Sequence, residues 1–140
     1  MKKHRLFAIS FLVVMTVWIT FPVFGQEKAK TEKTGLTVAR LVIGTGVENK
    51  EPAGVAETFP ATTEKVYCFL EATDIPEDVE ITFIWFHGEK EMLKSALPLK
   101  MGPRWRTYAD KNLYGLTGDW KVEVRDANGN LIKDVKFKVE

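Results

Sequence analysis

Apolar and charged residues alternate in two runs near the end of the chain, at 120–125 and at 134–140. A period of two residues predicts β-strands that have one buried and one exposed face. Between the runs stands Asn128-Gly129, a dipeptide preferred in turns where both residues have positive φ. This part of the sequence therefore predicts a C-terminal β-hairpin.

Short apolar runs bounded by Gly, Pro, Asn and Asp predict further strands upstream. They cover residues 36–43, 66–72, 79–86, 92–97 and 105–109. No segment shows a sustained apolar period of 3.6 residues, which argues against an α/β fold. Seven short strands predict an all-β fold over residues 36–140, an antiparallel, immunoglobulin-like β-sandwich of about seven strands.

One connection between these strands is long. Residues 44–60 contain charged residues and glycine but few large apolar side chains. Connections of this length are either binding loops or mobile segments, and the sequence favours neither interpretation.

The N-terminal residues have the order of a secretory signal. A basic start precedes an uncharged apolar run at 6–19, and Pro22, Val23 and Gly25 follow before Gln26. This pattern predicts a signal peptide at 1–25 and cleavage after Gly25. The alternative is an uncleaved membrane anchor, because the apolar stretch is nearly long enough to cross a bilayer. We expect an extracytoplasmic protein, periplasmic or secreted, that contacts the membrane only through this segment if it is retained.

The residues after the signal are nearly neutral in charge. Residues 26–35 are charged and polar, so we expect a flexible linker. The chain beyond residue 25 has 17 basic and 19 acidic groups, which argues against nucleic acid as a partner. Cys68 is the only cysteine, so no intramolecular disulfide forms. Its place in an alternating strand predicts a buried, unreactive thiol.

Candidates for catalysis are few. Beyond residue 25 the chain has one serine, Ser95, and one histidine, His87. Ser95 lacks the flanking glycines of a nucleophile elbow, and a Cys68–His87 dyad requires an exposed, electropositive thiol. His87 precedes Gly88 at an apparent turn, and no second ligand accompanies it, so we expect a solvated loop histidine. The sequence predicts no catalytic residue, no metal site and no cofactor.

The segment at 102–108 is the candidate binding site. Strand alternation places Arg104, Arg106 and Tyr108 on one face, with Trp105 on the other. Two guanidinium groups beside a phenol have the chemistry to bind a carboxylate, a phosphate or a sugar acid. In the alternative interpretation Trp105 fills the core and the arginines cover apolar surface or pair with nearby acids.

Six short segments carry a family resemblance. They are VAR at 38–40, GVENKEP at 46–52, TEKVY at 63–67, WFHG at 85–88, GPRWR at 102–106 and GDW at 118–120. Together they resemble an uncharacterised bacterial family, the domain of unknown function family numbered 2914, over residues 36–140. The resemblance implies an extracytoplasmic or membrane-attached module, and it implies no activity, substrate or catalytic residue.

These observations favour a non-catalytic binding or interaction module outside the cytoplasmic membrane, with an envelope protein or an acidic glycan as partner. One alternative is a small hydrolase of envelope glycans that acts through two carboxylates converging in a cleft. The other alternative is a purely structural envelope subunit, for which a large exposed apolar patch would be the mark.

Overall fold

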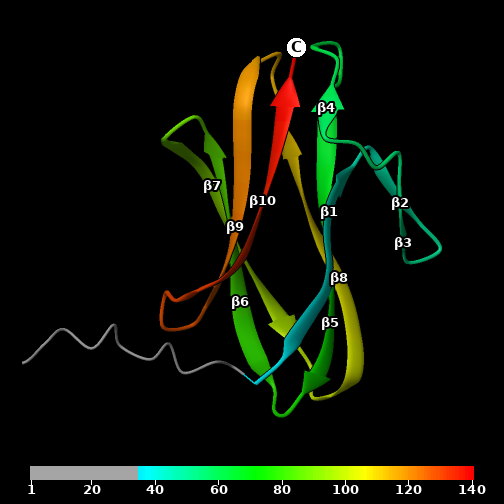
Figure 1. The fold of residues 1–140 in the computed structure, drawn as a ribbon, viewed down its shortest axis with the longest axis vertical. Helices are drawn as coiled ribbons and strands as arrows, with labels where there is room; N and C mark the ends of the chain where they lie inside the picture. Colours follow the sequence, from blue (N-terminus) through cyan, green and yellow to red (C-terminus); the bar gives the residue numbers. More distant parts are fainter. Residues whose placement is uncertain (1–34) are drawn as a thin grey trace, which may run out of the picture.

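Two β-sheets face each other across an apolar core in the computed structural model of the chain, which describes residues 35–140 (Figure 1). The predicted signal peptide at 1–25, and all of the predicted linker at 26–35 except Gly35, lie outside the described residues. Within residues 35–140, no helix is long and apolar enough to cross a membrane.

The described chain contains three sheets. The first has the strand order β1 (Thr37–Gly44), β5 (Lys65–Ile75) and β8 (Gly102–Asn112). The second has the order β4 (Thr58–Phe59), β10 (Leu131–Val139), β9 (Gly118–Asp126), β6 (Val79–His87) and β7 (Lys90–Leu99). The third is a small hairpin of β2 (Gly46–Glu48) and β3 (Glu51–Ala53). All neighbours pair antiparallel except β4 and β10, which are parallel.

The all-β fold and the antiparallel sandwich are confirmed, but the number of strands is ten in the described residues rather than about seven. The seven predicted strands correspond to β1 and to β5 through β10. The three additional strands, β2, β3 and β4, all lie in the segment 44–60, which is therefore not simply a loop. Strands of two or three residues are too short to show an alternating pattern. The immunoglobulin-like arrangement stays a prediction.

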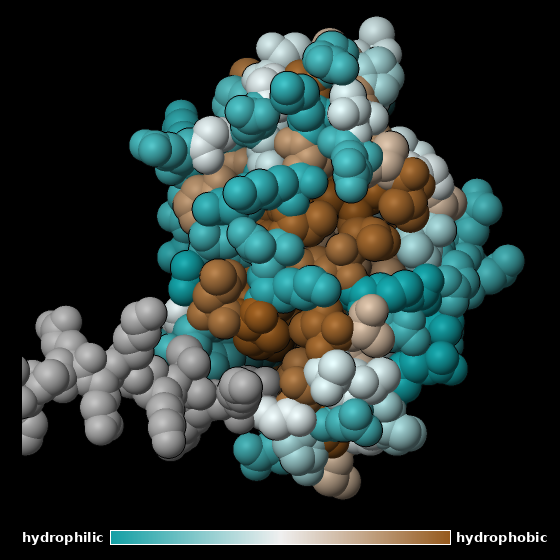
Figure 2. Space-filling model, in the orientation of Figure 1, coloured by the Kyte–Doolittle hydropathy of each residue, from teal (hydrophilic) through white to brown (hydrophobic). Residues whose placement is uncertain are grey.

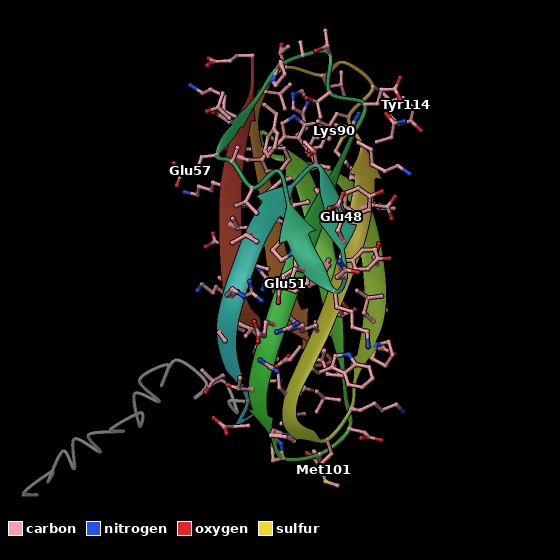
Figure 3. All side chains as sticks on the ribbon, turned by 90° about the vertical axis from the view of Figure 1, so that its right-hand side faces the viewer. Glu48, Glu51, Glu57, Lys90, Met101 and Tyr114 are labelled. Carbon is pink, nitrogen blue, oxygen red and sulfur yellow. The ribbon has the colours of Figure 1, made fainter. Side chains whose placement is uncertain are left out.

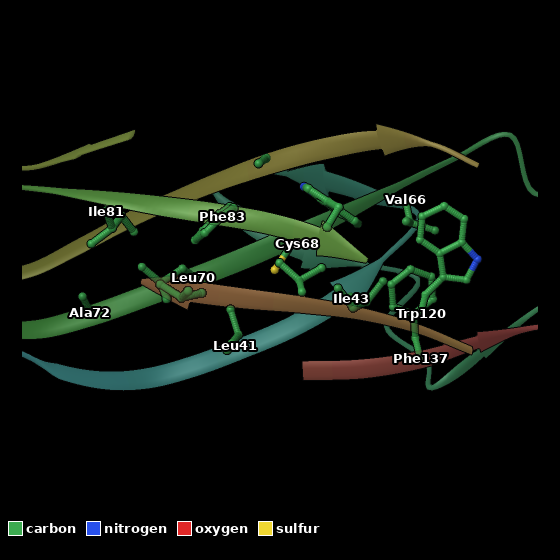
Figure 4. Close-up of a cluster of buried hydrophobic side chains, with 14 of the residues drawn as sticks. Leu41, Ile43, Val66, Cys68, Leu70, Ala72, Ile81, Phe83, Trp120 and Phe137 are labelled. Atoms are coloured by element: carbon green, nitrogen blue, oxygen red, sulfur yellow. The ribbon is translucent and has the colours of Figure 1, made fainter. Parts of the chain in front are cut away.

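The core lies between the two large sheets and follows from the alternation in their strands. Trp120, Val122 and Val124 of β9 are buried, as the sequence predicts. Further buried side chains include Cys68 on β5 of the facing sheet, and Phe83 and Phe137 on the neighbouring strands β6 and β10 (Figure 4). Cys68 is fully buried, which confirms the predicted environment of the thiol.

The predicted C-terminal hairpin is present, but its turn differs from the prediction. Of the dipeptide Asn128-Gly129, only Gly129 has positive φ, at 83°. The Asp126 carboxylate accepts hydrogen bonds from the backbone N–H groups of Asn128 and Asn130, both at 2.9 Å. An aspartate that satisfies backbone groups a few residues ahead stabilises a longer turn than the two-residue hairpin loop.

The two large sheets leave part of the core visible between β10 and β1. Figure 2 shows apolar side chains gathered between these strands in the orientation of Figure 1. Val38 of β1 and Ile132 and Val135 of β10 pack against the core but are only partly buried. β1 and β10 belong to different sheets and are not hydrogen-bonded neighbours, so backbone pairing does not close this side of the sandwich.

Candidate functional site

The candidate site lies on the outer face of the sheet formed by β1, β5 and β8. A register shift between Val38 and Arg40 leaves Ala39 without a partner on β5. Because of this bulge, Val38 and Leu41 both face the core although they are three residues apart. Arg40 consequently points outward. The outward residues of β5 and β8 follow by ordinary strand alternation.

Three charged residues form a row across this face. In the strand register Arg40 lies opposite Glu71, and Glu71 lies opposite Arg106. Arg40 Nε is 2.7 Å from Glu71 Oε2, and Arg106 Nε is 3.6 Å from Glu71 Oε1. Opposite charges in directly facing positions stabilise a pair of strands. The buried Glu71 carboxylate is thereby flanked by an arginine on each side.

A second carboxylate reaches the same arginines from the β2–β3 hairpin. Figure 3 views the outer face of the sheet, with Glu48 and Glu51 labelled on the hairpin in front of it. Glu51 Oε2 is 2.8 Å from Arg40 Nη1, and Glu51 Oε1 is 2.8 Å from Arg106 Nη1. Each oxygen of this carboxylate therefore pairs with a different guanidinium group.

Arg104 completes what we call the arginine–glutamate cluster, which consists of Arg40, Glu51, Glu71, Arg104 and Arg106. Arg104 Nη1 lies 3.3 Å from Glu71 Oε1. Three guanidinium groups and two carboxylates leave the cluster with one formal positive charge in excess. The cluster therefore retains attraction for a further anion.

Hydrogen bonds from Arg40 are the main cause of the pKa shifts of the two carboxyl groups. They hold the pKa of Glu51 and the pKa of Glu71 below the usual value of 4.5. The same two bonds, with the attraction of both carboxylates, raise the pKa of Arg40 above its usual value. Both glutamates are thus ionised at neutral pH, and the cluster is held together as ion pairs rather than as neutral hydrogen bonds.

Exposure differs sharply between the predicted site residues. The Arg104 side chain is 57% exposed, whereas that of Arg106 is 25% exposed. Tyr108 is 48% exposed, and its ring meets the Tyr67 ring edge-on at 5.8 Å between centroids. A guanidinium group has five N–H donors, and for Arg104 the described residues provide one partner, Glu71. Arg104 and Tyr108 are therefore the accessible part of the site.

Arg106 is held in place by contacts within the protein. Besides its contact with Glu51, its Nη1 donates a hydrogen bond of 3.4 Å to the backbone oxygen of Lys50. Its Nε is buried and has no hydrogen-bond partner among the described residues. Arg106 therefore pairs with nearby acids, as the alternative interpretation of this segment predicts. Trp105 packs partly buried against the core, as the same alternative required.

Three members of the cluster were not candidates from the sequence. Arg40 is turned outward by a bulge, Glu51 stands in a segment read as a loop, and Glu71 belongs to a strand that is mostly apolar. Of these three, only Glu71 could have been recognised from the sequence, because a charged residue within a buried strand normally has a partner of opposite charge. The identity of that partner followed only from the strand order.

The other residues considered for catalysis do not come together. Cys68 lies in the first sheet and His87 in the second, and burial raises the pKa of the Cys68 thiol. The sequence predicts a solvated loop histidine at position 87. His87 is instead the last residue of β6. Its Nε2 is 2.6 Å from the Thr117 backbone oxygen, and its ring lies 4.8 Å from that of Trp120. The strand simply continues to the residue before Gly88.

Two further features of the described residues bear on ligand binding. Among residues 35–140, no three His, Cys, Asp or Glu side chains are grouped so that they could hold a metal ion. An open hollow of about 1010 Å³ lies by the second sheet, away from the arginine–glutamate cluster. Its lining includes Thr58, Trp120, Lys136 and Phe137.

Comparison with known proteins supports the family resemblance. The family described as "Protein of unknown function (DUF2914)" matches residues 78–139, which span β6 to β10. The chain thus resembles this family over somewhat less than half of its length, and the match includes Arg104, Arg106 and Tyr108 but not Arg40, Glu51 or Glu71. No curated protein matches the chain.

Solved structures with a similar arrangement are parts of much larger chains. A β-glucosidase from Erythrobacter marinus matches 75% of this chain and 15% of its own, with 4% identity and a TM-score of 0.49. A β-D-glucoside glucohydrolase from Trichoderma reesei matches 75% of this chain and 19% of its own, with 10% identity and a TM-score of 0.47. This chain spans less than a fifth of either protein, and the comparisons establish no enzyme activity for it.

Proposed function

We propose that residues 36–140 form a non-catalytic binding module that acts outside the cytoplasmic membrane. Its ligand would be an anionic surface of an envelope protein or an acidic glycan, bound through Arg104, Arg106 and Tyr108. The observation that carries this proposal is the charge of the arginine–glutamate cluster, which has one more cation than anion.

The three site residues would contribute differently. Arg104 is exposed, and most of its N–H groups have no partner among the described residues. It would therefore form charge-assisted hydrogen bonds with the ligand. Tyr108 would offer the exposed part of its ring and its hydroxyl. Arg106 is fixed by Glu51 and would mainly contribute its charge and the position of its neighbours.

The two carboxylates that meet in the cluster weigh against the hydrolase alternative. A glycosidase needs one carboxyl group that is protonated at working pH, which requires a raised pKa. The pKa values of Glu51 and Glu71 are shifted in the opposite direction, and both groups are engaged by arginine. Neither glutamate is suited to donate a proton to a leaving group.

The apolar side chains between β10 and β1 favour a second candidate, a structural envelope subunit. Val38, Ile132 and Val135 are only partly buried there, and Figure 2 shows apolar side chains gathered in this part of the surface. Exposed apolar patches often mark contacts with other proteins. Self-association that depends on these residues and not on Arg104 would support this candidate over the binding module.

The proposal can be tested by binding to envelope extract and to an acidic polysaccharide, polygalacturonate, with neutral dextran as comparison. The test variant is Arg104→Ala/Tyr108→Ala, because both residues are exposed and their loss leaves Glu71 paired with Arg40. Lys94→Ala/Tyr114→Ala is the matched control, since it removes one exposed cation and one exposed tyrosine elsewhere.

We expect the test variant to weaken binding at least about tenfold, because hydrogen bonds to charged groups contribute about 1.5–3 kcal/mol. The control should bind as the wild type does. An unchanged set of bound proteins together with unchanged retention of polygalacturonate would refute the proposal.

A further inference from the structure

Glu51 is the one member of the arginine–glutamate cluster that does not belong to the large sheet. It stands at the start of β3, directly after the turn of the β2–β3 hairpin. The turn residues Asn49 and Lys50 both have positive φ, at 52° and 61°, as a two-residue hairpin turn requires. Glu51 thus reaches Arg40 and Arg106 from a separate, short element that lies over the sheet (Figure 3).

The base of this hairpin is fixed by close backbone contact. Thr45 N–H donates a hydrogen bond of 3.0 Å to the Ala53 backbone oxygen. A Cβ atom on Gly44 would lie 2.4 Å from the same oxygen, and one on Gly54 would lie 2.0 Å from Thr45 Oγ1. A side chain at either position would clash, so the base of the hairpin lies in close contact with the end of β1.

The tip is attached to the sheet through polar side-chain contacts that solvent reaches. Within residues 35–140, its polar attachments to the sheet are the two ion pairs of Glu51 and the 3.4 Å hydrogen bond from Arg106 to the Lys50 backbone oxygen. The Glu51 side chain is 45% exposed. Ion pairs at that exposure are screened by solvent and salt, and they exchange readily with other anions.

The way in which Glu51 is held is also the way in which an external carboxylate would be held. One carboxylate places each of its oxygens 2.8 Å from a different guanidinium group. This is the charge-assisted geometry with which arginines recognise acidic ligands. The excess positive charge at Arg104 remains free to engage a second acidic group of the same ligand.

We propose that Glu51 occupies the site of a ligand carboxylate, so that binding of an acidic polysaccharide and docking of the hairpin tip exclude each other. This inference rests on the proposed function and names the ligand as a polymer of uronic acids. A tethered carboxylate has an effective concentration in the millimolar range, so a single free carboxylate competes poorly. A polymer overcomes this competition because a second carboxylate binds Arg104.

Removal of the competing charge tests the inference. Glu51→Gln keeps the shape of the side chain but abolishes its charge. Glu48→Gln is the matched control, because Glu48 lies opposite Glu51 across the same hairpin and is exposed. Affinity for an oligogalacturonate is measured by titration calorimetry at low salt, with the chain that begins at Gln26.

We expect Glu51→Gln to bind about tenfold more tightly than the wild type, within the range usual for coupled sites. Glu48→Gln should change the affinity by less than about twofold relative to the wild type. If the wild type binds and Glu51→Gln binds equally well or more weakly, the inference is wrong and the proposed function stands. If no variant binds, the inference is wrong, and the proposed function is then decided by the binding to envelope extract alone.

Amide hydrogen exchange provides a second measurement that needs no variant. At saturating oligogalacturonate, exchange in residues 46–53 of the wild type should become faster, because the released tip loses its contact with the sheet. Slower exchange in this segment would mean that the hairpin closes over the ligand, and it would overturn the proposal of mutual exclusion.

Discussion

Phe59 should be among the residues on which the stability of the domain depends most, although it stands in a segment that the sequence presented as a loop. β4 has only two residues, yet the Phe59 side chain is 2% exposed. Its ring meets the Phe137 ring edge-on, at 5.8 Å between centroids and 84° between planes. The backbone around it is paired with β10 independently of the side chain, because Lys138 N–H and Glu140 N–H bond to Glu57 and Phe59 oxygens.

Phe59→Ala should therefore remove packing and leave the strand in place. Truncation of a buried phenylalanine costs about 3–5 kcal/mol, a large part of the roughly 5–15 kcal/mol by which domains are stable. A loss of about 3 kcal/mol divided by a urea slope of about 1–3 kcal/mol/M lowers the unfolding midpoint by at least about 1 M. The slope itself should not change, since the same surface is exposed on unfolding.

Urea unfolding followed by tryptophan fluorescence measures this loss. Thr58→Ala is the matched control, because Thr58 is the exposed neighbour on the same strand and should change stability by less than about 0.5 kcal/mol. A loss below about 1 kcal/mol for Phe59→Ala would refute the reasoning, since it would show that the aromatic pair does not close this end of the core.

Two further predictions follow from titratable groups. The Cys68 thiol, whose pKa is raised by burial, should react with a thiol reagent only on unfolding, and labelling within minutes in the absence of urea would contradict a closed core. Because Arg40 lowers the pKa of Glu71, the stability that this carboxylate provides is fully present above about pH 4.5 and is lost as the pH falls further. The loss of stability between pH 7 and pH 3 should therefore be smaller in Glu71→Gln than in the wild type; equal losses in urea unfolding would speak against a folded-state shift of this carboxyl.

The sequence predicted what depends on local alternation. Strands as long as β9 show the pattern directly, and the same rule placed Arg104, Arg106 and Tyr108 together on one side of β8. It could not predict the short strands of the segment 44–60, whose turn uses Asn49-Lys50 rather than the usual Asn-Gly.

The partners of the candidate site could not be predicted for a different reason. Arg40 and Glu71 are neighbours only because β1 pairs with β5, and they are 31 residues apart in the chain. Glu51 joins them only because the hairpin lies over the sheet. Such contacts depend on strand order and on a bulge, and neither leaves a periodic signal in the sequence.

The ends of the described domain lie far apart, and this arrangement determines how the domain would respond to tension. In Figure 1 the chain enters β1 at one end of the sandwich, and β10 finishes at the opposite end. A force applied between Leu36 and Glu140 would act along both strands and load the hydrogen bonds of β1 with β5 and of β10 with β9 in shear. Bonds sheared in this way must break together rather than one after another. The domain should therefore resist extension when it is pulled between these two residues.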